Sequence, residues 1–234
     1  MDTLPIYIPI VFIVTTVLTY VLFAAAVTPP RFGAVSKVVV LAFIPLWALL
    51  HGWLASSGFY IDTVSVPPPF LLYGAFPGFL FIVLYFTFAP KAFVDRNLSL
   101  RALTLVHIVR IPVEIGLYFL ALSKTIPDEM TFAGLNYDIL SGVFAPIIFF
   151  LGFKGGKPRP WVLGIYNVAG LLLLANVLMI AFLSFPMVGQ KLALSQPNRA
   201  VLYFPYIWLP TIIVPIVLFS HLASLWRLLF ARDR

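Results

Sequence analysis

Residues 5–27 read PIYIPIVFIVTTVLTYVLFAAAV, a run that contains no charged side chain. A helix needs about 20 mostly apolar residues to cross the hydrocarbon core of a bilayer. This run is long enough, and residues 1–4 before it lack the Lys or Arg that a cleaved signal peptide requires. The stretch therefore predicts a membrane-spanning helix that remains in the protein.

The composition of the whole chain agrees with this first run. Of the 234 residues, 62% are hydrophobic and only 10% are charged, and the mean hydropathy is +1.06. Soluble domains are about 45–50% apolar and about 25% charged. The composition therefore predicts an all-α fold, a polytopic transmembrane helix bundle whose main solvent and partner is the lipid bilayer.

Further apolar runs are separated by short segments rich in Pro, Gly and Asn, which are typical of loops. We expect about seven spans, at residues 5–27, 35–56, 70–89, 102–123, 137–153, 161–184 and 203–230. None of the connections is long enough for a soluble domain, so residues 1–234 are expected to form a single transmembrane helical domain. Any binding or active site then lies between helices or at the membrane surface.

The basic residues predict the orientation of the bundle. With seven spans and the N-terminus outside, the outer segments hold only Lys124, Lys191 and Arg199. The inner segments hold Arg31, Lys37, Lys91, Arg96, Arg101, Lys154, Lys157, Arg159, Arg227, Arg232 and Arg234. Cytoplasmic loops carry an excess of Lys and Arg. The bias therefore predicts the N-terminus out and the C-terminus in.

Several functional classes are disfavoured by what the sequence lacks. There is no Cys, which excludes disulfides and Cys-ligated metal or haem. The net charge of +7 is carried by short loops beside membrane spans, where it contacts lipid headgroups, so no nucleic-acid partner is predicted. No HExxH, GxSxG or P-loop motif occurs, so no metal site is predicted and the enzyme question stays open.

The strongest functional signal is a polar stripe in the fourth span. At 100° per residue, His107, Arg110 and Glu114 fall within about 60° of one another on one helix face, and Tyr118 joins the same stripe. A charged side chain near mid-membrane costs about 2.5–3.5 kcal/mol on insertion scales. The stripe should therefore face the interior of the bundle or a wet cavity.

Two interpretations of this stripe remain. In the functional one, Arg110 binds a negative group, Glu114 accepts or donates a proton, and His107 relays it. In the structural one, the stripe is a buried ion pair that fixes helix packing. Because Arg110 and Glu114 are four residues apart, we expect that they can pair directly.

Three more residues are candidates for the same site. His221 in the seventh span should lie at a depth similar to that of His107, so the two histidines could bind a b-type haem. Asp138 begins the fifth span, where a helix-capping role is favoured. Asn167 in the sixth span suits an interhelical hydrogen bond. His51, near the outer end of the second span, is expected to be interfacial.

A resemblance adds a biological setting. The segment Leu105–Phe153, with HIVRIPVE at residues 107–114 and FAGLNYD at residues 132–138, resembles small bacterial multi-pass membrane proteins of unknown activity. The resemblance implies a bacterial cytoplasmic (inner) membrane. It implies no activity.

Three functions therefore compete. The first is a transporter or binding protein whose polar intramembrane site takes a small molecule, an anion or a proton. The second is a membrane-embedded redox or lipid-modifying enzyme. The third is a sensor or accessory subunit that meets a membrane-protein partner or a second copy of itself. The ligand is expected to be a small molecule or a lipid.

Overall fold

The computed structural model describes residues 4–27, 34–88 and 98–230, with the backbone alone at 34–37, 39 and 40. The predicted end of the third span, Ala89, lies outside the described residues. So do Arg31, Lys91, Arg96, Arg232 and Arg234 and the side chain of Lys37.

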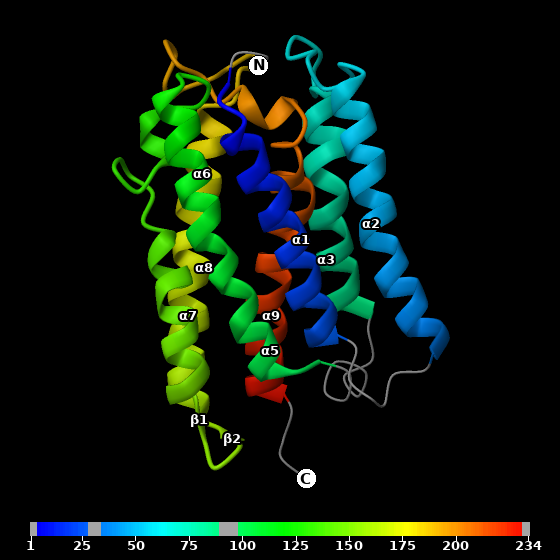
Figure 1. Ribbon diagram of the computed structural model, residues 1–234, viewed down its shortest axis with the longest axis vertical. Coiled ribbons are helices and arrows are strands. Elements are labelled where there is room, and N and C mark those ends of the chain that lie inside the picture. Colours follow the sequence, from blue (N-terminus) through cyan, green and yellow to red (C-terminus); the bar gives the residue numbers. More distant parts are fainter. Residues whose placement is uncertain (1–3, 28–33, 89–97, 231–234) are drawn as a thin grey trace.

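The described residues form a helix at each of the seven predicted spans, roughly side by side, so the all-α bundle is confirmed (Figure 1). The rods are α1 (Tyr7–Val27), α2 (Ala34–Ser56), η1–α3 (Phe70–Ala75 and Phe76–Phe88), α5–η2–α6 (Leu100–Val106, His107–Val109 and Arg110–Leu122), α7 (Ile139–Leu151), α8 (Pro160–Leu183) and η5–α9 (Leu209–Ile213 and Val214–Phe230). Within the described residues, five rods are long and apolar enough to cross a membrane, whereas α7 and the searched part of α2 are shorter.

Local sequence signals explain where several of these rods begin. Ser99 precedes α5 and accepts a hydrogen bond from the Ala102 backbone N–H, an N-cap. Pro160 opens α8, where a missing N–H is harmless. Between α7 and α8, Gly155 and Gly156 adopt positive φ in a two-residue turn that joins the short strands β1 (Phe153–Lys154) and β2 (Lys157–Pro158).

The seventh rod begins later than predicted. Instead of a helix from Tyr203, the chain makes a short 3-10 turn η4 (Ala200–Leu202) and then further turns before η5 begins at Leu209. Pro205 lies in this segment, and a proline disfavours helical geometry at the residue before it. Pro210 lies in the first turn of η5, where a proline is tolerated. Pro205 accounts for the late start.

Prolines also lie inside two of the rods, where side chains of other helices bond the carbonyls that they leave free. A proline removes the bond to the carbonyl four residues earlier. Pro45 frees the Leu41 carbonyl, which accepts a 3.0 Å bond from the Tyr20 hydroxyl of α1. Pro215 frees the Thr211 carbonyl, which accepts a 3.2 Å bond from the indole N–H of Trp47. These bonds link α2 to α1 and to the seventh rod.

Tyr20→Phe is expected to destabilise the protein by about 1 kcal/mol, because the Leu41 carbonyl loses its donor. Thermal unfolding of the purified protein measures the effect. The Pro45→Ala background is the control, since an alanine at this position can supply an intrahelical N–H to the same carbonyl. An equal loss in both backgrounds would contradict this account.

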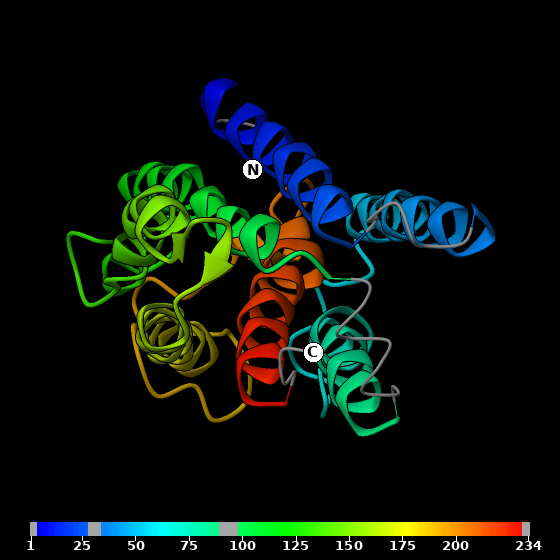
Figure 2. The same cartoon turned by 90° about the horizontal axis from the view of Figure 1, so that it is seen from below.

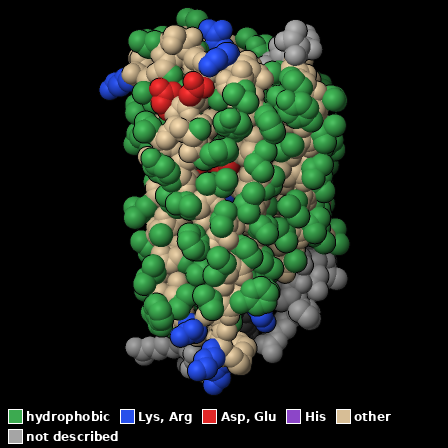
Figure 3. Space-filling model, turned by 60° about the vertical axis from the view of Figure 1, so that its left-hand side comes forward, with side chains coloured by type: hydrophobic (Ala, Val, Ile, Leu, Met, Phe, Trp, Pro, Cys, Tyr) green, Lys and Arg blue, Asp and Glu red, His purple; other side chains and the backbone are tan. Residues whose placement is uncertain are grey.

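Apolar side chains cover the outside of the bundle as well as its core. The main core joins α1, α6, α8 and α9 and includes Phe12, Leu117 and Leu174. Figure 3 shows a flank covered by hydrophobic side chains, with charged groups gathered at the two ends. Contiguous apolar surface on this scale is rare in soluble monomers. Together with the five long apolar helices, it makes the protein an integral membrane protein.

Seen from below, α9 lies between α8 and α3, and α2 lies at the periphery beyond α1 (Figure 2). In this view α9 lies in the middle of the bundle. The termini orientation and the single-domain organisation stay predictions.

Candidate functional site

Arg110 is the centre of a buried polar network near the middle of its rod. It lies ten residues after the start of α5, about 15 Å along the rod, and it is 2% exposed. Its Nη1 donates to Asp138 Oδ1 at 2.5 Å and to the Gly170 carbonyl at 3.3 Å. Its Nη2 donates to His221 Nε2 at 3.2 Å. One guanidinium thus joins α6 to α7, α8 and α9.

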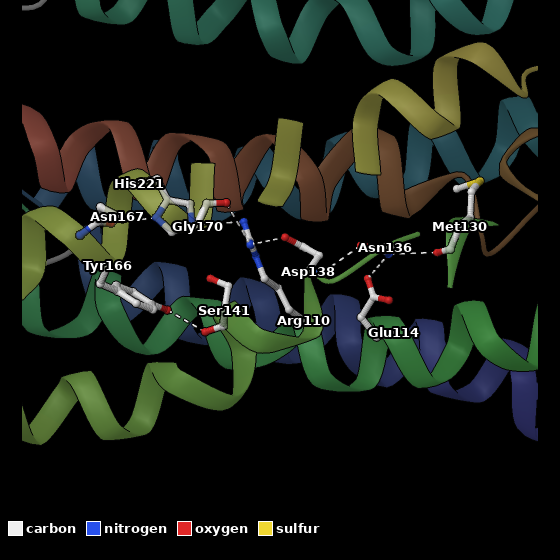
Figure 4. A network of polar contacts seen from close by, with 10 residues as sticks. All are labelled: Arg110, Glu114, Met130, Asn136, Asp138, Ser141, Tyr166, Asn167, Gly170 and His221. Carbon is white, nitrogen blue, oxygen red and sulfur yellow. Dashed lines mark hydrogen bonds and ion pairs between the residues drawn. The ribbon is translucent and has the colours of Figure 1, made fainter. Parts of the chain in front are cut away.

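The position of Asp138 corrects the capping prediction. Its side chain makes no hydrogen bond to the first turn of α7 as the structure describes it and instead pairs with Arg110. The segment after α6 folds back into the bundle, so the 13-residue α7 starts beside Arg110 (Figure 4). The ion pair takes precedence because an unpaired guanidinium at this depth would be costly.

Glu114 does not pair with Arg110, so the direct i,i+4 pair predicted from the sequence is wrong. Both terminal nitrogens of Arg110 are engaged by other helices. Glu114 Oε1 instead accepts a 2.7 Å bond from Asn136 Nδ2. The other carboxyl oxygen, Oε2, is buried and has no hydrogen-bond partner among the described residues.

Asn136 organises this end of the network. Its amide nitrogen also donates to the Met130 carbonyl at 2.9 Å, and its oxygen accepts from the Asp138 backbone N–H at 2.9 Å. The last bond is an Asx turn, a common role for Asn just before a helix. Asn136 therefore fixes both Glu114 and the start of α7.

At the other end, the surroundings of His221 define its tautomer. An arginine can only donate, so His221 Nε2 accepts from Arg110 and Nδ1 carries the proton. That proton is donated to Asn167 Oδ1 at 2.8 Å, while Asn167 Nδ2 donates to the Leu163 carbonyl. Asn167 thus makes the interhelical bond expected of it. Figure 4 shows the contacts running from Asn167 through Arg110 to Met130.

His107 and His221 lie together, but their arrangement does not fit a haem. Their rings stack face to face with centroids 3.7 Å apart and planes at 15°. Both nitrogens of His221 are occupied, and the stack leaves no space for a porphyrin between the rings. Both nitrogens of His107 are buried without a partner among the described residues. Within the described chain, no group of three or more His, Cys, Asp or Glu side chains is placed to hold a metal.

Tyr118 and His51 lie away from the network. Tyr118 is half-buried and stacks on Phe132, with centroids 5.1 Å apart. His51 lies near the end of α2, as expected, and is 1% exposed, because its Nδ1 bonds the Tyr60 hydroxyl at 2.6 Å and its ring packs on Trp47. The structure thus brings His107, Arg110, Glu114, Asp138, Asn167 and His221 into one network.

A cavity of about 290 Å³ opens beside the network. Among the described residues that line it, the charged ones are Arg110, Glu114 and Asp138. Its walls come from η1, α3, α6, α8 and α9 and are otherwise almost entirely apolar, with Leu174 and Val177 among them. Sites for small ligands have this character, apolar with a few placed polar groups, and start at about 300 Å³.

One family model matches the part of the chain that contains the site. A domain of unknown function, DUF8737, matches residues 67–229, well over half of the sequence. The chain belongs to the DUF8737 family. The matched region contains every residue of the polar network and every wall of the cavity, whereas α1 and α2 precede it. No curated protein and no solved structure matches the chain significantly.

Sequence reasoning missed three parts of this DUF8737 site: Asn136, Gly170 and Tyr166. The Tyr166 hydroxyl donates to the Ser141 carbonyl at 2.9 Å, and its ring contacts His107 edge-on at 5.8 Å. The Asn two residues before an apolar run was a readable signal for an Asx turn. Gly170 carries no such signal, because its role depends on a carbonyl and on its lack of a side chain.

Proposed function

We propose that this DUF8737 protein is an intramembrane binding protein or transporter for a small amphipathic molecule. The observation that carries the proposal is the 290 Å³ cavity, whose walls are apolar except at the Glu114 and Arg110–Asp138 end. The apolar body of a ligand would lie against α8 and α9, and its polar group would meet Glu114.

The unpaired Glu114 oxygen supports a binding role over a purely structural one. Buried polar atoms in native structures nearly always have a partner. Glu114 lines the cavity and is 1% exposed, yet its Oε2 has no partner among the described residues. A ligand group in the cavity would supply the missing bond.

The resemblance to bacterial proteins and the charge pattern support a bacterial cytoplasmic membrane, with the N-terminus outside. The end of the bundle with the β1–β2 turn carries Arg101, Lys154, Lys157, Arg159 and Arg227 among the described residues. Lys124, Lys191 and Arg199 are at the opposite end, where Asp62, Asp128 and Glu129 offset them. The positive-inside rule favours the first end as cytoplasmic.

Val177→Trp, which fills the cavity from α8, is expected to abolish binding of a neutral amphipathic probe, octan-1-ol. The protein would be reconstituted in phosphatidylcholine nanodiscs, and binding read from the rise in unfolding temperature with probe concentration. Leu172→Trp is the matched control, because Leu172 is 68% exposed on the same helix.

Ala181→Leu adds a smaller side chain to the same cavity. It replaces Val177→Trp in the test if that variant does not fold. The proposal is wrong if octan-1-ol stabilises the cavity-filled variants as much as it stabilises Leu172→Trp.

A further inference from the structure

We infer that the ligand of this cavity is a lipophilic amine that enters sideways from the bilayer and whose ammonium group pairs with Glu114. The inference rests on the proposed binding function and names its ligand class. Four features of the site lead to it: the charge balance, the bonds already made by Arg110, the aromatic walls and the position of the mouth.

The charges that line the cavity do not balance. Two carboxyl groups, Glu114 and Asp138, face one guanidinium, Arg110. Asp138 already pairs with Arg110 at 2.5 Å, so the pair is neutral as a unit. Glu114 is left with one neutral donor, Asn136. An ionised Glu114 at this depth requires a cation, and a bound ammonium group would provide both the charge and a donor for Oε2.

An anionic ligand is disfavoured by the bonds of Arg110. Carboxylates and phosphates are bound best by the two parallel N–H groups of a guanidinium. Nη1 is occupied by Asp138 and the Gly170 carbonyl, and Nη2 by His221. Of the three guanidinium nitrogens, only Nε lacks a partner among the described residues. An anion there would also lie next to two carboxyl groups, so Arg110 serves to hold Asp138 rather than a ligand.

The far wall of the cavity suits a cation with an apolar body. Phe70, Phe79, Phe182 and Phe185 line it, and the rings of Phe70 and Phe185 stack with centroids 4.8 Å apart. Aromatic faces attract ammonium groups as well as apolar chains. A positively charged amphipathic molecule can therefore contact this wall at any stage of its passage toward Glu114.

The mouth of the cavity lies on the side of the bundle. Phe182 on α8 lines the cavity and is 50% exposed, and half-exposed residues of α3 and η5–α9 also line it. In Figure 2, α9 lies between α8 and α3. All three rods contribute lining residues to the cavity. Since this surface faces lipid, a ligand dissolved in the membrane reaches the site without crossing water.

Three probes with the same chain length test the inference: octylamine, octan-1-ol and octanoate. Their affinities would be measured from the unfolding temperature in phosphatidylcholine nanodiscs at pH 7. On the wild-type protein, we expect octylamine to bind at least tenfold more tightly than octan-1-ol and octanoate to bind most weakly. In Glu114→Gln, octylamine should lose at least tenfold in affinity and should no longer bind more tightly than octan-1-ol.

The outcomes separate this inference from the proposed function. If the three probes bind equally, or octanoate binds best, the amine inference is overturned while the cavity remains a binding site. If Val177→Trp and Ala181→Leu leave the binding of every probe unchanged, the proposed function fails as well. The ranking on the wild-type protein needs no variant, so it holds even if Glu114→Gln does not fold.

Discussion

Arg110→Met is expected to destabilise the folded protein by about 3–5 kcal/mol, the cost of leaving one partner of a buried ion pair uncompensated. Asp138 would keep its charge in the bundle, 5% exposed, without the guanidinium that now neutralises it. His221 Nε2 and the Gly170 carbonyl would lose their donors as well. Reversible unfolding in mixed micelles measures the loss, and poor accumulation in the membrane is its expected sign in cells.

The double variant Arg110→Met/Asp138→Leu is the control for this prediction. Replacing a whole buried ion pair by apolar side chains is often neutral or stabilising, so the double variant should recover most of the lost stability. If it is as unstable as the sum of the single variants, the Arg110–Asp138 pair is not what the substitution disrupts. Full stability of Arg110→Met alone would refute the buried pair itself.

Gly170→Ala is expected to cost about 3 kcal/mol, although it adds a single methyl group. A Cβ there would lie 2.3 Å from His221 Cε1 and 2.5 Å from its Nε2. The imidazole cannot move aside, because His107 stacks on it and both of its nitrogens are bonded. Overpacking costs about 1–3 kcal/mol, and a lost bond to the Arg110 guanidinium adds to this.

Gly164→Ala, on the same helix, is the matched control. A Cβ at Gly164 meets no atom of the described residues within 4 Å, and Ala is favoured over Gly inside a helix by about 0.5–1 kcal/mol. The control should therefore be neutral or slightly stabilising in the same unfolding experiment. Equal stabilities for the two variants would mean that α8 does not approach His221 as closely as Gly170 requires.

The sequence by itself determined the class of the fold and the number of its rods. Apolar runs of about 20 residues are enough to predict membrane-spanning helices, because in lipid every backbone polar group must be satisfied within a helix. The predicted helix boundaries agree with the structure to within a few residues where proline, serine or glycine marks the end of a helix. The predicted start of the seventh rod, Tyr203, was wrong, since the apolar pattern continues through Pro205 although the helix begins only at Leu209.

The sequence also located the polar centre, because charged residues inside a span must turn inward. His107, Arg110 and Glu114 were identified from the spacing within one helix, which is a local property. His221 and Asp138 were also named as candidates for the site, but which groups pair with Arg110 and Glu114 was not predicted. Helical periodicity places Glu114 beside Arg110, but it carries no information about competing groups on other helices.

Only the tertiary structure decided which groups pair. The chain after α6 folds back into the bundle, so that Asp138 pairs with Arg110 and Asn136 bonds Glu114. Gly170 lets His221 approach, and the stack on His107 follows. Each of these contacts joins residues at least 22 positions apart, and their choice depends on the desolvation of every buried group at once. The total desolvation cost depends on packing in three dimensions, so no local pattern along the chain can predict it.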